Sequence, residues 1–212
     1  MNTFPQEEVI TAILVGIVNA HNTNKKWAKG AWLSMAPEYM LNIFIGQEFA
    51  KLQNKPNIWF EVSIPDLADS IGFDENDPNK PKEAFINCIQ RNNYKNEKID
   101  IVLDTGDVSK VLIEVKNAVT KYDVLENDVI RLCDAMKHKS QLEYGVIAFY
   151  ANVNSKKKIE NLIQEIEDGI ERTVQKGNYK IKPINLTNYI NIDRDKVDGW
   201  SCAAISFVLE SY

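Results

Sequence analysis

Two short apolar segments near the middle of the chain constrain its fold more than any other feature. Residues 98–103 (KIDIVL) and 110–116 (KVLIEVK) are rich in β-branched side chains, which favour strands. Residues 104–107 (DTGD), which follow the first segment, have the composition of a hairpin turn. The sequence therefore predicts an antiparallel hairpin, against which the rest of the chain must pack.

The segments on either side of this hairpin alternate between helical and extended patterns. Apolar residues recur at helical spacing in residues 10–18, 37–52, 122–136 and 155–174. Pro37 is expected at the first position of the second helix, and Ser155 is expected to cap the fourth. Extended patterns occur at residues 57–64, 144–150, 179–186 and 201–210. Pro183 is expected to confine its strand to an edge of the sheet.

These elements predict a single α/β domain that spans residues 1–212. A mixed central β-sheet is expected to be flanked by helices on both faces. Its core is expected at about 38–150, with the C-terminal helix and strands of 155–210 packed on it. Residues 66–81 contain a cluster of Asp, Asn, Pro and Gly, and we expect a loop there, or a short helix and a loop, that is mobile or contacts substrate.

Composition and charge narrow the class of protein. A chain of 212 residues with 44% hydrophobic content can bury a substantial core. The formal net charge of −5 argues against an extended, nonspecific nucleic-acid binder, although a local basic groove is compatible with it. No apolar run could cross a bilayer, and Glu7 and Glu8 stand where a signal peptide carries positive charge. Cys88, Cys133 and Cys202 are widely spaced and are expected to be reduced, buried thiols of a cytoplasmic protein.

Charged residues inside the two hairpin strands are the candidates for chemistry. Period-two alternation places Glu114 and Lys116 on one face of their strand. Asp100 is expected to point away from Ile99 and Ile101, and so to converge with Glu114 and Lys116. Charges in apolar segments are costly, and two carboxylates beside one ammonium leave negative charge that a divalent cation would balance. Carboxylate and carbonyl oxygens suit Mg²⁺, which can activate water and neutralise a phosphodiester.

These strands carry a family resemblance. The segments KIDIVL at 98–103 and IEVKN at 113–117 resemble the hairpin core of the PD-(D/E)XK nuclease superfamily, with thirteen residues between Asp100 and Glu114. The literal Pro-Asp pair is absent at this place, because Ile99 precedes the aspartate. The resemblance extends over residues 38–150 and predicts a restriction-endonuclease-like core.

The resemblance also implies a set of functional residues. Asp100 and Glu114 would bind Mg²⁺, which Mn²⁺ can replace, and the Val115 carbonyl would be a further metal ligand. Lys116 would be the catalytic lysine. Members of the superfamily often add a glutamate from the helix that precedes the core, and Glu38 is the candidate for this catalytic residue.

Two assignments stay open on the sequence alone. The family pattern favours Glu38 as the helix glutamate, whereas helix geometry places Glu48 nearer the centre of the apolar stripe. Asp128 and Arg131 are three residues apart in the helix after the hairpin, and we expect them to form a surface pair. A role for this pair in supporting the site or binding phosphate is the alternative.

Three functions from different classes fit the sequence. The first is a metal-dependent nuclease that hydrolyses phosphodiester bonds in restriction, repair or defence, with DNA favoured over RNA as its partner. The second is a noncatalytic nuclease-fold module that binds nucleic acid or protein. The third is a structural α/β protein in which the pattern arose by chance. No membrane partner is expected, and a homodimer is a possible assembly.

Overall fold

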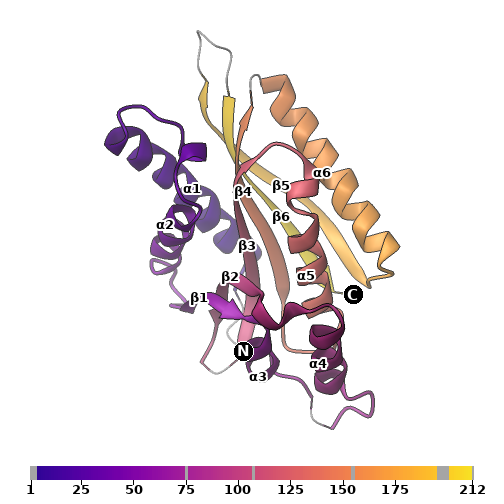
Figure 1. The fold of residues 1–212 in the computed structure, drawn as a ribbon. Helices are drawn as coiled ribbons and strands as arrows, with labels where there is room; N and C mark the ends of the chain where they lie inside the picture. The colour runs from indigo at the N-terminus through magenta and orange to yellow at the C-terminus, as the bar shows by residue number, and fades with distance from the viewer. Residues whose placement is uncertain (1–3, 75, 107, 154–155, 195–200, 212) are drawn as a thin grey trace.

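A mixed β-sheet forms the centre of the computed structural model, which describes residues 4–74, 76–106, 108–153, 156–194 and 201–211. Among these residues, six strands lie in the order β1-β2-β3-β4-β6-β5 (Figure 1). The strands are β1 (Asn57–Ser63), β2 (Lys98–Asp104), β3 (Ser109–Val119), β4 (Tyr144–Val153), β5 (Ile181–Arg194) and β6 (Ser201–Ser211). β3 and β4 pair in parallel, and the other neighbouring strands pair antiparallel. The predicted α/β class and mixed sheet are confirmed.

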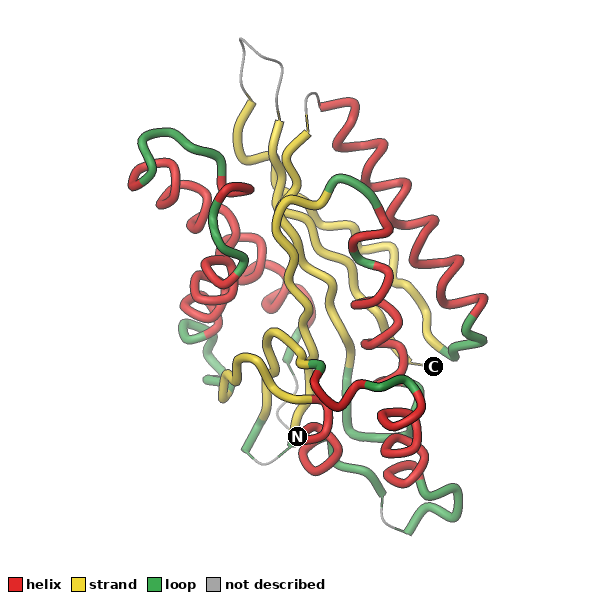
Figure 2. The backbone as a smooth tube through the Cα atoms, viewed as in Figure 1, coloured by secondary structure: helices red, strands yellow, loops and turns green. Residues whose placement is uncertain are grey.

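Helices cover both faces of this sheet (Figure 1, Figure 2). The α-helices are α1 (Gln6–Trp27), α2 (Tyr39–Phe49), α3 (Ile64–Ser70), α4 (Pro81–Arg91), α5 (Glu126–Met136) and α6 (Lys156–Lys176). The described residues also form the short 3-10 helices η1 (Leu33–Met35), η2 (Tyr94–Asn96) and η3 (Tyr122–Val124). α1 and α2 lie on one face, and α3, α4, α5 and α6 lie on the other. Strands β2 and β3 are therefore enclosed between two helical layers.

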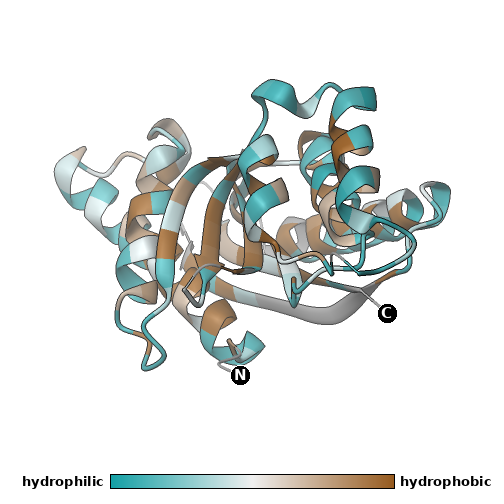
Figure 3. Ribbon diagram, turned by 90° about the horizontal axis from the view of Figure 1, so that it is seen from below, coloured by the Kyte–Doolittle hydropathy of each residue, from teal (hydrophilic) through white to brown (hydrophobic). Residues whose placement is uncertain are grey.

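Each face of the sheet has its own hydrophobic core. Ile113 and Val115 of β3 join the core beneath α1 and α2. Leu112, the residue before Ile113, joins the core beneath α3 to α6. Figure 3 shows that the central strands are largely hydrophobic, whereas the outer surfaces of the helices are hydrophilic. Alternation along β3 therefore turns Glu114 and Lys116 toward the same helical layer as Leu112.

The predicted hairpin is formed by β2 and β3. Ile101 lies opposite Ile113 in the antiparallel ladder. Gly106 in the turn has a φ of 92°, a left-handed conformation that costs glycine little. Asp100 and Glu114 are the chain neighbours of Ile101 and Ile113, so the two charges of the motif lie on neighbouring strands. The expected turn residue Asp107 lies outside the described residues.

Several boundaries differ from the sequence prediction. α4 was not predicted, although its buried side chains Phe85, Cys88 and Ile89 recur at helical spacing. α2 begins at Tyr39, so Pro37 lies two residues before the first helical position rather than at it. Within the predicted loop segment 66–81, α3 ends at Ser70, residues 71–74 and 76–80 form a loop, and α4 begins at Pro81, which agrees with the predicted short helix and loop.

The C-terminal region bears on three further expectations. β5 is an edge strand, which is where Pro183 can be accommodated because it has no N–H to donate. The predicted helix cap Ser155 lies outside the described residues. Cys202 is buried, like Cys88 and Cys133, as expected. None of the described helices has the length and apolar composition needed to cross a membrane.

Candidate active site

Strand β3 presents Glu114 and Lys116 to the layer that contains α5. Glu114 is almost completely buried, with 1% of its surface exposed. The Lys116 side chain is partly exposed, so its ammonium group lies at the boundary between the core and solvent. The two residues follow the predicted alternation, and they differ in their access to water.

Asp100, on β2, brings its carboxylate to the same site as Glu114 and Lys116. Its Oδ2 accepts a hydrogen bond of 2.8 Å from the backbone N–H of Val115. Its negative charge raises the pKa of both Glu114 and Lys116. The structure therefore brings Asp100, Glu114 and Lys116 together at one end of the hairpin.

The path of β2 through Asp100 is irregular. The sequence predicted that Ile99 and Ile101 share a face, and this is wrong, because they belong to the two opposite cores. On β1, Glu61 lies between the residues that pair with Ile101 and Ile99, and it has a φ of 56°. Such local irregularity increases the twist of a strand pair. The strand consequently turns at Asp100, and the carboxylate is directed to the backbone of β3.

Glu38 comes from the helical layer of α1 and α2, on the face of the sheet opposite to α5. It occupies the N-terminal cap position of α2. Its Oε2 accepts a hydrogen bond of 2.9 Å from the backbone N–H of Asn117, and its Oε1 lies 3.6 Å from Nζ of Lys116. Glu38 therefore faces Lys116 from the side opposite to α5.

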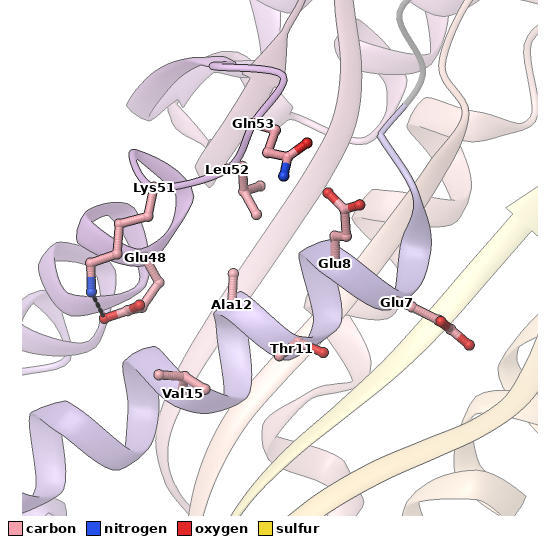
Figure 4. Close-up of a pocket in the computed structure, with 9 residues that line it drawn as sticks. All are labelled: Glu7, Glu8, Thr11, Ala12, Val15, Glu48, Lys51, Leu52 and Gln53. Atoms are coloured by element: carbon pink, nitrogen blue, oxygen red, sulfur yellow. Dashed lines mark hydrogen bonds and ion pairs between the residues drawn. The ribbon is translucent and has the colours of Figure 1, made fainter.

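Glu48 lies elsewhere. It accepts a hydrogen bond of 2.9 Å from Asn19 and pairs with Lys51 at 2.6 Å. It lines a groove of about 430 Å³ between α1 and α2, together with Glu7 and Glu8 (Figure 4). Of the two glutamates that the sequence left open, Glu38 is the one at the cluster.

Asn117 positions Glu38, a role that the sequence motif did not reveal. Its side-chain amide donates hydrogen bonds to the carbonyls of Leu33 and Ala36, at 2.9 and 2.8 Å. These bonds hold the segment before α2 against the end of β3. The amide acts on backbone carbonyls far away in the sequence, so no local pattern could have indicated it.

Helix α5 contributes two more charged residues. The expectation that Asp128 and Arg131 form a surface pair is wrong, because they are only 4% and 8% exposed. Arg131 pairs through Nε with Glu114 at 2.6 Å and through Nη2 with Asp128 at 2.6 Å. Asp128 also lies 3.4 Å from Nζ of Lys116. The helix packs tightly on β3, and this packing buries a pair that would be solvated on an isolated helix.

Burial and neighbouring charges shift the pKa values of Glu114, Asp128 and Lys116 in opposite directions. Burial raises the pKa of Glu114 well above its usual range, and the guanidinium of Arg131 opposes this shift. Burial also raises the pKa of Asp128, opposed by Lys116 and Arg131. Burial would lower the pKa of Lys116, but the carboxylates of Asp128 and Glu38 outweigh it, and the net shift is upward. Lys116 is therefore held as an ammonium ion.

A polar cavity of about 530 Å³ opens beside Lys116. Asn92, Asn93 and Glu97 line it from the segment around η2, and Asn127 lines it from α5. Asp128 and Arg131 form part of its wall. One oxygen of Asp128, Oδ2, is buried and forms the ion pair with Lys116. The cavity thus provides space for a polar ligand directly next to the charged cluster.

The predicted metal site calls for an excess of negative charge, and the residues of the cluster supply one when all are ionised. The four carboxylates of Glu38, Asp100, Glu114 and Asp128 exceed the two cations, Lys116 and Arg131, by two negative charges. Hydrogen bonds occupy one oxygen each of Asp100 and Glu114. Their second oxygens are the atoms that a divalent cation could bind, so the residue types and the charge balance fit Mg²⁺.

The side-chain positions are not those of an assembled metal site. No three acidic, histidine or cysteine side chains of the described residues are grouped closely enough to hold one metal ion. Oε1 of Glu114 is bonded to Arg131, and Oδ2 of Asp100 is bonded to the N–H of Val115. A metal ion would therefore have to bind these two carboxylates through their second oxygens.

Comparisons with protein-family models, with curated proteins and with solved structures found no match to this chain. The local geometry of the cluster therefore carries the functional argument that follows.

Proposed function

We propose that this chain is a Mg²⁺-dependent nuclease of the PD-(D/E)XK type, with a restriction-endonuclease-like core over residues 38–150. It would hydrolyse phosphodiester bonds, with DNA favoured over RNA, in restriction, repair or defence. One observation carries the proposal: Lys116 lies among Glu38, Asp100, Glu114 and Asp128 at the open end of a hairpin, beside a polar cavity. A structural protein gains little from such an excess of partly buried carboxylates, because charges lose hydration when they are buried.

In this proposal, Asp100, Glu114 and the Val115 carbonyl would hold the metal ion. A bound Mg²⁺ supplies positive charge that acidifies water and neutralises the phosphodiester. Glu114 can contribute only in its ionised form; burial raises its pKa, and the charge of Arg131 opposes that shift, as a bound cation would. Asp100 is held in place by the N–H of Val115. The ligands thus come from both strands of the hairpin, which fixes their separation.

Lys116 and Glu38 have complementary roles toward the attacking water. The raised pKa of Lys116 keeps it protonated, so it cannot accept a proton from water. It can instead orient the water and stabilise negative charge on the phosphate oxygens. Glu38, at 3.6 Å from Lys116 and partly exposed, is the carboxylate placed to accept the proton.

The cavity beside Lys116 is where the phosphodiester would enter. Its lining combines the ammonium of Lys116 with the side-chain amides of Asn93 and Asn127. Amides can donate hydrogen bonds to phosphate or base oxygens. The site therefore combines a catalytic cation with neutral donors, which limits the repulsion that the nearby carboxylates exert on phosphate.

A noncatalytic binding module of the same fold is the alternative, and one observation favours it. The described residues contain no group of three acidic, histidine or cysteine side chains that could hold a metal ion. A module of this kind would bind nucleic acid or protein without metal-dependent cleavage.

The proposal is tested by incubating the protein with supercoiled, linear and single-stranded DNA and with RNA. Each substrate is given Mg²⁺ or Mn²⁺, with or without EDTA. We expect cleavage that EDTA abolishes and that Asp100→Ala, Glu114→Ala and Lys116→Ala each reduce by several orders of magnitude. Lys121→Ala is the matched control, because Lys121 is exposed and forms an ion pair with its near neighbour Asp123. Wild-type protein that cleaves no substrate with either metal would show the proposal to be wrong.

A further inference from the structure

We propose that Asp128 and Arg131 are positioning residues of this site, which hold Glu114 and Lys116 in their working places. The proposal rests on the proposed function. Neither residue is assigned to the reacting atoms. Their effect would be exerted through the two residues of β3 that they contact.

The geometry links the strand and the helix through four charges. Glu114 and Lys116 are two residues apart on β3, and Asp128 and Arg131 are three residues apart on α5. Arg131 binds Glu114, and Asp128 binds Lys116, so each strand charge meets an opposite helix charge. Arg131 and Asp128 also bind one another at 2.6 Å. The four residues therefore form one connected set with no net charge, in which displacement of one member disturbs the others.

Each of the three nitrogens of the Arg131 guanidinium donates a hydrogen bond to a carboxylate. Nε donates to Glu114, Nη2 donates to Asp128, and Nη1 donates to Glu97 at 3.0 Å. Glu97 lies in the segment that lines the cavity, so Arg131 ties β3, α5 and the cavity wall together. A lysine has one ammonium on a flexible stem and cannot reproduce this planar arrangement. The contact set is consequently specific for arginine.

Stability alone is a poor explanation for this arrangement. Buried ion pairs lose hydration, and apolar residues of similar size often stabilise a protein equally well or better. Arg131 contacts Glu114 through Oε1, so Oε2 is the oxygen that would meet a metal ion. Partners that orient a metal-binding carboxylate in this way usually affect metal affinity or activity by about 10–100-fold. The observed contacts match such a role.

The test compares Arg131→Lys with Arg172→Lys, a control on the exposed surface of α6. Mn²⁺ affinity is measured by titration without substrate, and cleavage is measured in single-turnover reactions. For Arg131→Lys we expect both to fall by about 10–100-fold. For Arg172→Lys we expect no change in either. Circular dichroism establishes that each variant is folded.

Chemical rescue distinguishes positioning from a general structural role. In Arg131→Ala, millimolar guanidinium chloride should restore part of the lost Mn²⁺ affinity and cleavage, whereas ammonium chloride at the same ionic strength should not. If the Arg131 variants do not fold, the near-isosteric variant Asp128→Asn provides the test of the proposal. We expect its cleavage to be at least about tenfold lower than that of the wild type.

The outcomes separate this proposal from the proposed function. Wild-type cleavage together with unchanged Mn²⁺ affinity and cleavage in folded Arg131→Lys would overturn the positioning role alone. Failure of guanidinium to rescue folded Arg131→Ala would do the same, as would unchanged cleavage in Asp128→Asn. A wild-type protein that neither binds Mn²⁺ nor cleaves would overturn the proposed function, and the positioning role with it.

Discussion

The ionisation of individual residues in the cluster depends on burial as well as on their neighbours. Glu114 is buried against Arg131, whereas Glu38 is partly exposed beside Lys116. Two glutamates that contact the same strand therefore have different environments. In the proposed reaction this difference gives them different tasks, because Glu114 would hold metal and Glu38 would exchange a proton with water.

Glu38→Gln tests this division of tasks. The amide keeps the shape of the side chain but cannot accept a proton, so cleavage should fall by about 10²–10⁴-fold. Mn²⁺ affinity should change much less, since Glu38 is not among the proposed metal ligands. Glu48→Gln is the matched control from the same helix, and it should cleave like the wild type. Equal losses in both variants would contradict the placement of Glu38 in the reaction.

His138 provides a pH-dependent prediction about stability. Burial lowers its pKa from 6.5 to about 4, with a further contribution from the positive charge of Lys137. Its Nε2 is buried without a hydrogen bond in the described residues, and its ring packs against Phe85. Between pH 6.5 and 4 the unfolded chain binds a proton that the folded protein does not, so the free energy of unfolding should fall as the pH is lowered.

The contribution of His138 is measured by comparison with His138→Gln, which cannot titrate. Urea unfolding at pH 7.5 and at pH 4.5 gives the acid-induced loss for each protein. We expect the loss in the wild type to exceed that in the variant by about 1–2 kcal/mol, a value reduced for partial exposure of the ring. Identical losses would mean that His138 accepts its proton as readily in the folded protein as in the unfolded chain.

At the scale of elements, the packing of α1 on α2 is what holds the helix of Glu38 in place. Gly16 of α1 lies against α2, where an added Cβ would come within 2.6 Å of the backbone Cα of Ile45. Backbone cannot move aside as a flexible side chain can. The close approach of the two helices therefore depends on the absence of a side chain at this position.

Gly16→Ala should consequently destabilise the protein by about 1–3 kcal/mol. Alanine is normally the better helix former by about 1 kcal/mol, so the sign of the change identifies the clash. Asn22→Ala is the control, at an exposed position of the same helix, and it should be neutral or slightly stabilising. Urea denaturation of both variants measures the difference. A Gly16→Ala protein as stable as the wild type would show that α1 and α2 do not pack this closely.

At the scale of the whole molecule, the net charge of −5 sets the conditions for nucleic-acid binding. DNA and the protein repel each other at long range, and the carboxylates of the cluster add to this repulsion locally. A divalent cation at the site would remove part of it. The proposed metal therefore has a role in binding DNA as well as in chemistry.

Asp100→Ala should bind DNA in EDTA as tightly as the wild type, or up to about tenfold more tightly, because a carboxylate that repels phosphate is removed. Lys116→Ala should bind slightly more weakly for the opposite reason. Asp168→Ala, on the exposed face of α6, is the control and should leave affinity unchanged. Fluorescence anisotropy over a range of salt concentrations makes the comparison. Weaker binding by Asp100→Ala would indicate that this carboxylate contacts DNA favourably.

The sequence by itself determined the parts of this protein that depend on neighbours along the chain. β-branched runs and turn residues located the hairpin, and period-two alternation placed Glu114 and Lys116 on one face. These features arise within a few residues of backbone, so a local pattern suffices. The mixed sheet and its helical layers followed from the order of the elements.

Tertiary structure decided the contacts that cross between elements. The choice of Glu38 over Glu48 depends on how α2 meets β3, 79 residues further along the chain. The pairing of Arg131 with Glu114 depends on how α5 lies on the sheet. The orientation of Asp100 depends on an irregular pairing with β1. Periodicity defines a face of one element, but which charge lies opposite that face is set by the packing of another.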